Sequence, residues 1–190
     1  MKKDIILAGV GGQGILTIAT VIGQAAVSSN MYIKQAEVHG MSQRGGDVQS
    51  HLRISDQEIF SDLIPMGQAD LILSVEPMES LRYLPYLNEN GWLIANATPF
   101  VNIPNYPEKE EVYEQIKKYK NHVLIDADTM AKEIGSARSM NMVILGASVK
   151  TLGFTLEQIE DAIKVVFGRK GDAIVESNIK ALRAGFEAAK

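Results

Sequence analysis

The sequence predicts an α/β fold with a doubly wound, mostly parallel sheet and a helical C-terminal segment. Short apolar runs rich in β-branched residues alternate with stretches of helical periodicity, and this alternation implies right-handed βαβ crossovers. A glycine-rich turn separates the first strand from the first helix. With 190 residues, of which 46% are hydrophobic, the chain can bury an ordinary core, so we expect a single domain over residues 1–190.

The first half of the chain begins with a strand over residues 4–10, a continuous apolar run that stops at glycine. A helix over 15–27 follows, because its apolar residues are spaced three or four apart. Residues 31–38 predict a second strand. Residues 48–55 alternate between two kinds of side chain, which indicates a strand with one face on the core and the other on solvent or a partner.

The second half continues the alternation and ends in helices. Residues 96–107 contain several prolines and are expected to form a surface excursion. The pattern from 141 to 190 is helical, with breaks near Gly153 and 168–171, and Thr155 with a glutamine three residues later predicts a capping box. The remaining predicted elements are strands over 69–75, 91–97 and 122–127, a helix over 77–87 and a helix between 108 and 119.

The composition excludes several classes of function. The formal net charge is −4, so the sequence gives no basic face for nucleic acid. The chain has no cysteine, which excludes a disulfide, a thiol nucleophile and an all-cysteine iron–sulfur cluster on this chain. The apolar run after Met1 is too short for a signal peptide, and no apolar stretch is long enough to span a membrane. We therefore expect a cytoplasmic protein that binds neither nucleic acid nor membrane.

The most informative motif is the GVGGQG turn. Gly9, Gly11 and Gly14 match G-x-G-x-x-G, with a strand before the motif and a helix after it. Glycines let the backbone approach a ligand closely, and the N–H groups at the helix start attract phosphate. We interpret the turn as a phosphate-binding loop at the carboxyl end of the first strand, on the edge of a cleft. The alternative is a tight β–α turn that needs glycine only for packing.

A second polar segment begins at the end of the second predicted strand. Glu37 lies 23 residues after Gly14, roughly where a dinucleotide-binding fold carries its ribose-binding carboxylate. The chain then runs into HGMSQRGG at 39–46, which is unlike a ribose-binding turn. Arg44 could hold an anion with its planar fork while Gly45–Gly46 offer backbone donors. We favour a ligand or subunit contact over a surface loop whose arginine only pairs with a carboxylate.

The other polar residues give weaker signals. His39, His51 and His122 lack the spacing of a metal site, so no metal ligand is expected on this chain. Asp126 and Asp128 follow a predicted strand, where catalytic carboxylates can lie. Alternatively, Asp128 caps a helix that begins at the next residue.

Four motifs together resemble a known family: GVGGQG at 9–14, HGMSQRGG at 39–46, HLRIS at 51–55 and NMVILGA at 141–147. They are similar to the gamma subunit or domain of the 2-oxoacid:ferredoxin oxidoreductases, which has a Rossmann-like fold. Among these, the short stand-alone chain is most similar to the beta subunit of indolepyruvate:ferredoxin oxidoreductase. The resemblance covers essentially the whole sequence, and the 39–55 region is its most specific part.

The resemblance implies a role in a larger enzyme. Such complexes decarboxylate a 2-oxoacid on thiamine diphosphate, pass electrons through iron–sulfur clusters to ferredoxin and transfer the acyl group to coenzyme A. It implies that this chain helps form the coenzyme A site, carries no catalytic residue of its own and is inactive alone. The cofactor-binding positions carried over from the family are Gly9, Gly11, Gly12, Gln13, Gly14, Ser42, Gln43, Arg44, Gly45 and Gly46.

Thiamine diphosphate, its magnesium ion and the clusters are expected on larger partner subunits, with ferredoxin reached through them. This agrees with the absence of cysteine and of the G-D-G…N-N pattern of a thiamine site. Contacts between two copies of the chain are also considered, and the identity of the 2-oxoacid stays open. Two alternatives remain, a stand-alone NAD- or FAD-dependent oxidoreductase and a non-catalytic scaffold subunit. Against the first, a chain of 190 residues leaves little room for a substrate-binding domain.

Overall fold

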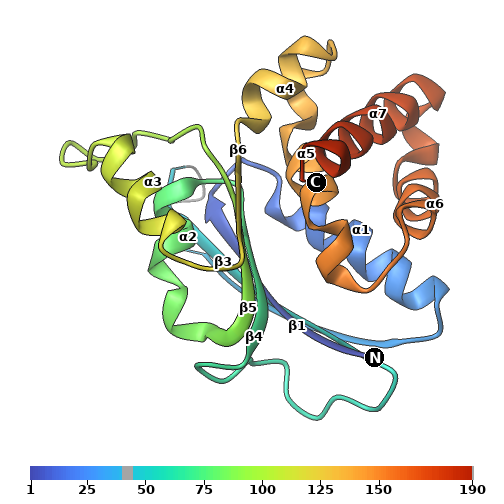
Figure 1. Ribbon diagram of the computed structural model, residues 1–190. Coiled ribbons are helices and arrows are strands. Elements are labelled where there is room, and N and C mark those ends of the chain that lie inside the picture. The colour runs from blue at the N-terminus through green and yellow to red at the C-terminus, as the bar shows by residue number, and fades with distance from the viewer. Residues whose placement is uncertain (40–44, 190) are drawn as a thin grey trace.

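The computed structural model describes residues 1–39 and 45–189 (Figure 1). Within that part, a six-stranded sheet has the strand order β2-β3-β1-β4-β5-β6. Helices cover both faces of this sheet, so the α/β, doubly wound architecture is confirmed. The strands are β1 (Lys2–Val10), β2 (Tyr32–His39), β3 (Asp47–Ser55), β4 (Ala69–Ser74), β5 (Leu87–Asn96) and β6 (His122–Ile125).

The sheet is mixed rather than wholly parallel. Strands β1, β4, β5 and β6 pair in parallel, whereas β3 is antiparallel to both of its neighbours, β1 and β2. A parallel connection needs a crossover of a dozen or more residues, and the chain between His39 and Asp47 is too short for one. The strands at 31–38 and 48–55 therefore form a hairpin that inserts β3 between β1 and β2.

The two faces of β1 pack against different helices. Ile5 and Leu7 join the larger core under α1, α4, α5, α6 and α7, while Ile6 and Ala8 join the smaller core under α2 and α3. This alternation follows from the period of two in a strand. The helices are α1 (Ile15–Ser28), α2 (Pro77–Arg82), α3 (Lys109–Lys117), α4 (Ala127–Glu133), α5 (Met140–Leu152), α6 (Leu156–Phe167) and α7 (Asp172–Ala188), with short 3₁₀ helices η1 (Leu84–Tyr86), η2 (Ala137–Ser139) and η3 (Gly168–Lys170). None of the helices in the described part is long and apolar enough to cross a bilayer.

Several predicted elements differ at their boundaries, and the strand expected over 122–127 ends at Ile125 because α4 begins at Ala127. The helix expected over 77–87 ends at Arg82 and continues as η1 around Pro85, because proline supplies no N–H to a helix interior. Strand β5 consequently starts at Leu87 rather than at 91. The capping box at Thr155 is confirmed, since its hydroxyl accepts from Gln158 N and the Gln158 amide accepts from Thr155 N.

Helices α5 and α7 pack with their backbones in contact. A Cβ on Gly146 would collide with the carbonyl of Leu182, and a Cβ on Gly185 would collide with the carbonyl of Val143. The absence of a side chain at Gly146 and Gly185 therefore permits the close packing of these two helices. This contact fixes α5, whose first residues lie beside the glycine loop.

Candidate functional site

The glycine loop follows the carboxyl end of β1, and α1 begins directly after it at Ile15. The N–H of Gly11 donates to the carbonyl of Gly46, with an N···O distance of 2.9 Å. The fold thus joins the GVGGQG turn to Gly45–Gly46, called here the second glycine segment, which is far away in the sequence. Ser42, Gln43 and Arg44, named above as binding residues, lie outside the described residues.

Each of three glycines in the loop has its own structural reason. A Cβ on Gly9 would collide with Val75 at the end of β4, so the first glycine is required for packing. Gly12 and Gly14 have φ angles of 100° and 84°, which side-chain-bearing residues rarely adopt. Gly12 is exposed and a Cβ there would meet open space, so this part of the backbone is accessible to a ligand.

Backbone donors at the start of α1 are unpaired. Among residues 1–39 and 45–189, no acceptor lies within hydrogen-bond distance of the N–H groups of Gly12, Gly14, Ile15 or Leu16. The next two N–H groups of the helix donate to the carbonyl of Gly14. Unpaired N–H groups and the positive end of the helix dipole together favour an anion at this position.

Two amide side chains hold the loop in this shape. Gln13 folds back on its own strand, and its Oε1 accepts from Val10 N at 2.8 Å. Asn141, at the start of α5, donates from Nδ2 to the carbonyl of Gly14 at 3.2 Å. Sequence reasoning assigned Gln13 to ligand binding, whereas here its carboxamide oxygen braces the loop. It assigned no role to Asn141, the first residue of the NMVILGA motif.

A loop over residues 97–107 lies against the second glycine segment. The Nδ2 of Asn102 donates to the carbonyl of Gly45 at 2.7 Å. Figure 1 shows this loop arching out near α3, at the edge of the sheet where the β1 arrow ends. The predicted surface excursion is confirmed, and its apex contacts the candidate site.

The same loop is anchored by a buried carboxylate. Glu76, which is 1% exposed, follows β4 and caps α2 by accepting from Glu79 N at 2.8 Å. Its other oxygen accepts from Phe100 N at 3.2 Å and from the hydroxyl of Tyr106. Burial and this carboxylate raise the pKa of Tyr106 far above its ordinary value, so the phenol stays protonated as a donor. Sequence reasoning missed Glu76 because the contact partners come from a distant loop.

The two aspartates after β6 have structural partners. Asp126 caps α4 by accepting from Thr129 N at 2.9 Å, and this hydrogen bond lowers the pKa of the carboxyl. The prediction that Asp128 caps a helix starting at Thr129 was wrong, because α4 begins earlier, at Ala127. Asp128 instead accepts from Nδ2 of buried Asn96 at 2.7 Å.

The two histidines whose side chains are described, His51 and His122, have partners within the chain. No cluster of potential ligands is found among the described residues. His51 is buried, its Nδ1 accepts from Ile64 N at 3.0 Å, and desolvation lowers its pKa. Nδ1 of His122 lies 2.6 Å from the carbonyl of Tyr119. The side chain of His39 is outside the described atoms.

The position of Glu37 disfavours the dinucleotide alternative. Glu37 lies opposite Ser50 of β3, and Ser50 lies opposite Leu7 of β1. Its strand is thus separated from β1 by an antiparallel strand, whereas a ribose-binding carboxylate is expected on the strand next to β1.

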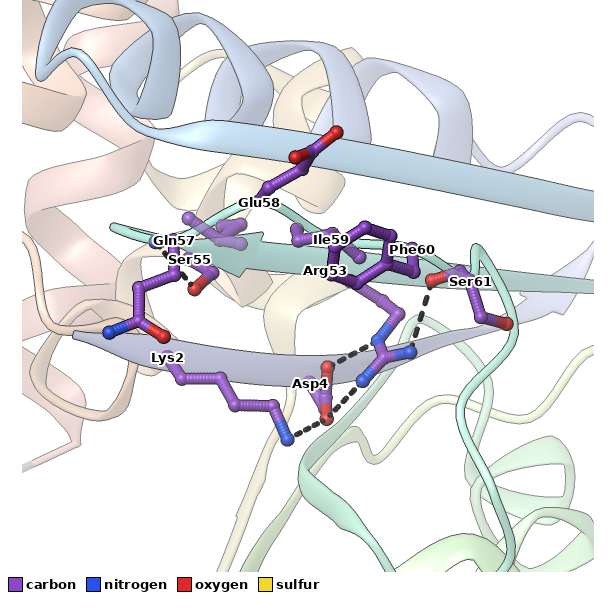
Figure 2. Close-up of a pocket in the computed structure, with 10 residues that line it drawn as sticks. Lys2, Asp4, Arg53, Ser55, Gln57, Glu58, Ile59, Phe60 and Ser61 are labelled. Carbon is purple, nitrogen blue, oxygen red and sulfur yellow. Dashed lines mark hydrogen bonds and ion pairs between the residues drawn. The ribbon is translucent and has the colours of Figure 1, made fainter.

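A pocket of about 350 Å³ lies at the opposite, amino end of β1 (Figure 2). Figure 2 shows Lys2 and Arg53 both pointing to the carboxylate of Asp4, and Arg53 also reaching the carbonyl of Ser61. Arg53 Nε lies 2.7 Å from Asp4, which is fully buried. Asp4 is thus shared by two cations, and the remaining N–H groups of Arg53 donate to the carbonyls of Ser61 and Leu63, so the guanidinium is satisfied within the chain.

Comparison with known proteins gives a consistent result. The family model described as pyruvate ferredoxin/flavodoxin oxidoreductase matches residues 4–188. The chain is 38% identical to the indolepyruvate oxidoreductase subunit IorB of Pyrococcus horikoshii, covering 100% of this chain and 98% of that protein. It is 32% identical to the common gamma subunit of the pyruvate/ketoisovalerate oxidoreductases of Pyrococcus abyssi, covering 97% of this chain and 95% of that one.

Solved structures agree on the fold. The gamma subunit of a keto/oxoacid ferredoxin oxidoreductase from Geobacter sulfurreducens superposes with a TM-score of 0.72 at 28% identity, covering 98% of each chain. The 2-oxoglutarate:ferredoxin oxidoreductase of Magnetococcus marinus gives a TM-score of 0.76 at 19% identity, covering 99% of this chain and 31% of that one. The chain therefore belongs to the pyruvate ferredoxin/flavodoxin oxidoreductase family, whose relatives named here are subunits of 2-oxoacid oxidoreductases.

Proposed function

We propose that this chain is the cluster-free subunit of an indolepyruvate- or pyruvate-type 2-oxoacid:ferredoxin oxidoreductase, and that its glycine loop binds the diphosphate of coenzyme A. The observation that carries the proposal is the group of unpaired N–H donors at Gly12, Gly14, Ile15 and Leu16. A diphosphate supplies the acceptors that these donors lack. The Magnetococcus structure, which shares the fold, was solved with coenzyme A and succinyl-CoA bound.

The division of labour follows from the composition. Because the chain has no cysteine, cysteine-ligated clusters must lie on partner subunits. Thiamine diphosphate, bound by a partner, supplies the carbanion chemistry of decarboxylation. The overall reaction converts a 2-oxoacid and coenzyme A to acyl-CoA and carbon dioxide, and two electrons pass through the clusters to ferredoxin. The described residues of this chain bind and orient the coenzyme.

The roles of individual groups follow from the geometry of the loop. The N–H groups of the first turn of α1 hold phosphate oxygens, and Gly9 and Gly14 keep the loop in its open shape. Gln13 and Asn141 brace the loop from either side. Arg44, carried over from the sequence motif, adds a guanidinium to the same diphosphate. A bound anion of this kind screens the helix dipole and replaces the water on these donors.

The sharpest test is Gly12→Asp. The position is exposed and open, so the new carboxylate meets no neighbouring side chain and repels phosphate, while Gly12→Asn carries the same backbone strain at a φ of 100° without the charge and should raise KM less. We expect the KM for coenzyme A of the reconstituted complex to rise at least about tenfold, which corresponds to losing one charge-assisted hydrogen bond of about 1.5 kcal/mol. The matched control is Gly67→Asp, another exposed glycine with positive φ and open space, which lies away from the loop. Equal KM values for both variants contradict the proposal.

A second test addresses the assignment of subunit roles. The purified chain alone is expected to oxidise no 2-oxoacid with ferredoxin or a viologen dye, and activity is expected only after a cluster-bearing subunit is added. Turnover by the isolated chain would overturn this assignment. Tight binding of NADH by the isolated chain would favour the dinucleotide alternative instead.

A further inference from the structure

Strand β2 leaves one side of the sheet open. It is hydrogen-bonded to β3, and no strand in the described part pairs with its other side. Its pairing with β3 is regular over eight residues, and its sequence has no proline. Edge strands usually carry a bulge, a proline or free charges that prevent further pairing. The lysine of β2, Lys34, has a hydrogen-bond partner within the chain, since its Nζ donates to the carbonyl of Phe60 at 3.4 Å. The opposite edge strand, β6, has only four residues.

Helix α1 presents apolar side chains beside this open edge. Leu16 and Val27 are both more than half exposed. They lie on the same side of the helix as Gly23, since positions seven and eleven residues apart return to one face. Gly23 packs directly on Ile33 of β2, where a Cβ would approach its Cδ1. The exposed side chains of Leu16 and Val27 therefore lie on the side of α1 that flanks the edge strand.

The opposite face of β2 is uncovered and also apolar. Tyr32 and Val38 are 53% and 59% exposed, and they point away from Ile33, which faces α1. The loop after β3 adds Phe60, which is 86% exposed and tied to Lys34 through its carbonyl. Figure 2 shows Phe60 over the sheet, in the same pocket wall as Arg53. These exposed apolar groups lie at both ends of the open edge and beside Lys34 at its centre, where a partner strand would cover them.

We propose that β2 pairs with β2 of a second copy of this chain, antiparallel and centred on Gln35, so that one sheet runs through both copies. A two-fold axis perpendicular to the sheet pairs only residues on the same face. Centring on Gln35 places Tyr32 opposite Val38 and Lys34 opposite Ala36 of the second copy. An aromatic residue opposite a β-branched one is a favourable cross-strand pair.

The neighbouring registers are worse. Centring on Lys34 would place the two lysines opposite each other, and like charges in that position are destabilising. Centring on Ala36 would move Tyr32 beyond the end of the partner strand. In the register centred on Gln35, the protruding ring of Phe60 lies toward the small side chain of Ala36 in the second copy, and the exposed apolar side chains of the two α1 helices become neighbours. The same register places Ile33 opposite Glu37 of the second copy, on the face of the strand that packs against α1, so the favourable pairs are those on the Tyr32 face. This proposal does not depend on the coenzyme A proposal, since it uses the side chain of Leu16, whereas the diphosphate would use the N–H of that residue.

The first test is the association state of the full-length chain, measured by sedimentation equilibrium. We expect a dimer for the unmodified chain. Ala36→Lys puts two lysines opposite each other twice per dimer, and should weaken dimerisation about tenfold. Adding Lys34→Glu to that variant turns each like-charge pair into an opposite-charge pair and should restore the dimer. Val165→Lys, at an exposed position on α6, is the matched control and should leave the dimer unchanged.

The second test uses the absence of cysteine in the chain. Tyr32→Cys combined with Val38→Cys should give a disulfide-linked dimer on mild oxidation, because directly opposite residues lie within reach of a disulfide. Val165→Cys combined with Ile174→Cys, both exposed and away from β2, should give none beyond background. A chain that is monomeric at all concentrations, a dimer indifferent to Ala36→Lys, or equal crosslinking of the two cysteine pairs would each overturn the proposal.

Discussion

The two ends of the sheet carry polar groups in opposite situations. At the amino end of β1, the buried carboxylate of Asp4 is paired with Arg53 and with the exposed Lys2. At the carboxyl end, the N–H groups of Gly12 and of the first turn of α1 have no acceptor among the described residues. The amino end has a pocket of about 350 Å³, but the carboxyl end has the unmet hydrogen-bonding capacity.

The difference shows that the volume of a pocket does not identify a ligand site. A buried ion pair with its hydrogen bonds completed gains nothing from a further polar ligand, whereas unpaired backbone donors do. Changes at the amino end should therefore affect stability, and changes at the glycine loop should affect binding. The following predictions test this separation from the largest expected effect to the smallest.

The largest effect is expected for Arg53→Ala. It leaves the carboxylate of Asp4 buried without its main partner and releases the carbonyls of Ser61 and Leu63. Breaking a buried pair in this way costs about 3–5 kcal/mol of unfolding free energy. Urea denaturation measures the loss. Lys2→Ala is the control, because Lys2 contacts the same carboxylate but is 60% exposed, and exposed pairs contribute about 1 kcal/mol or less. Similar losses for the two variants would contradict the distinction.

A smaller effect is expected for Tyr106→Phe. It removes a hydroxyl that donates to buried Glu76, and a hydrogen bond to a charged group contributes about 1.5–3 kcal/mol. The N–H of Phe100 also donates to Glu76, so its amide hydrogen exchange should accelerate as the 97–107 loop loosens. In the control Tyr113→Phe, the lost partner is a neutral carbonyl, that of Ala97, and the cost should be about 0.5–1.5 kcal/mol. Unchanged exchange at Phe100 would show that Glu76 does not anchor the loop.

The smallest effect is expected for Asp126→Ala, which removes the cap of α4 at a cost of about 1 kcal/mol. The folded-state pKa of Asp126 is lowered, chiefly by the N–H of Thr129. Its contribution is therefore complete above the ordinary pKa of about 3.9 and is lost as the pH falls through the lower folded-state value. Asp126→Asn keeps a capping oxygen and should remove only this pH dependence. Thermal unfolding at pH 7 and at low pH measures both effects, and identical pH profiles for the unmodified chain and the Asp126→Asn variant would contradict the assignment.

Much of the fold could be predicted because local patterns agreed with tertiary packing. The apolar run at 4–10 is buried on both faces of the sheet, and the capping box at Thr155 forms as its spacing indicates. The direction of β3 could not be predicted from its alternation, because a strand has the same period of two in either direction. The break at Pro85 also shifted the start of β5 by several residues.

The site was predicted in part. The glycine spacing indicated the turn after β1, and the structure adds the contact between Gly11 and Gly46. The braces from Asn141 and Asn102, and the anchor at Glu76, come from distant segments with ordinary local patterns. The roles of Ser42, Gln43 and Arg44 stay predictions. The place of Glu37, two strands from β1, appeared only once the strand order was known.

The sequence by itself determined the α/β class, the glycine loop and the exclusion of cysteine-ligated chemistry, because these depend on residue type and local spacing. Only the tertiary structure decided which polar groups are satisfied. Asp4 and Arg53 lie 49 residues apart, and Gly14 and Asn141 lie 127 residues apart. A change of a few tenths of an ångström in the donor–acceptor distance decides whether a hydrogen bond forms, and the packing of the whole sheet sets that distance. Whether a hydrogen-bond donor finds an acceptor within the chain or stays available to a ligand is therefore a property of the folded molecule.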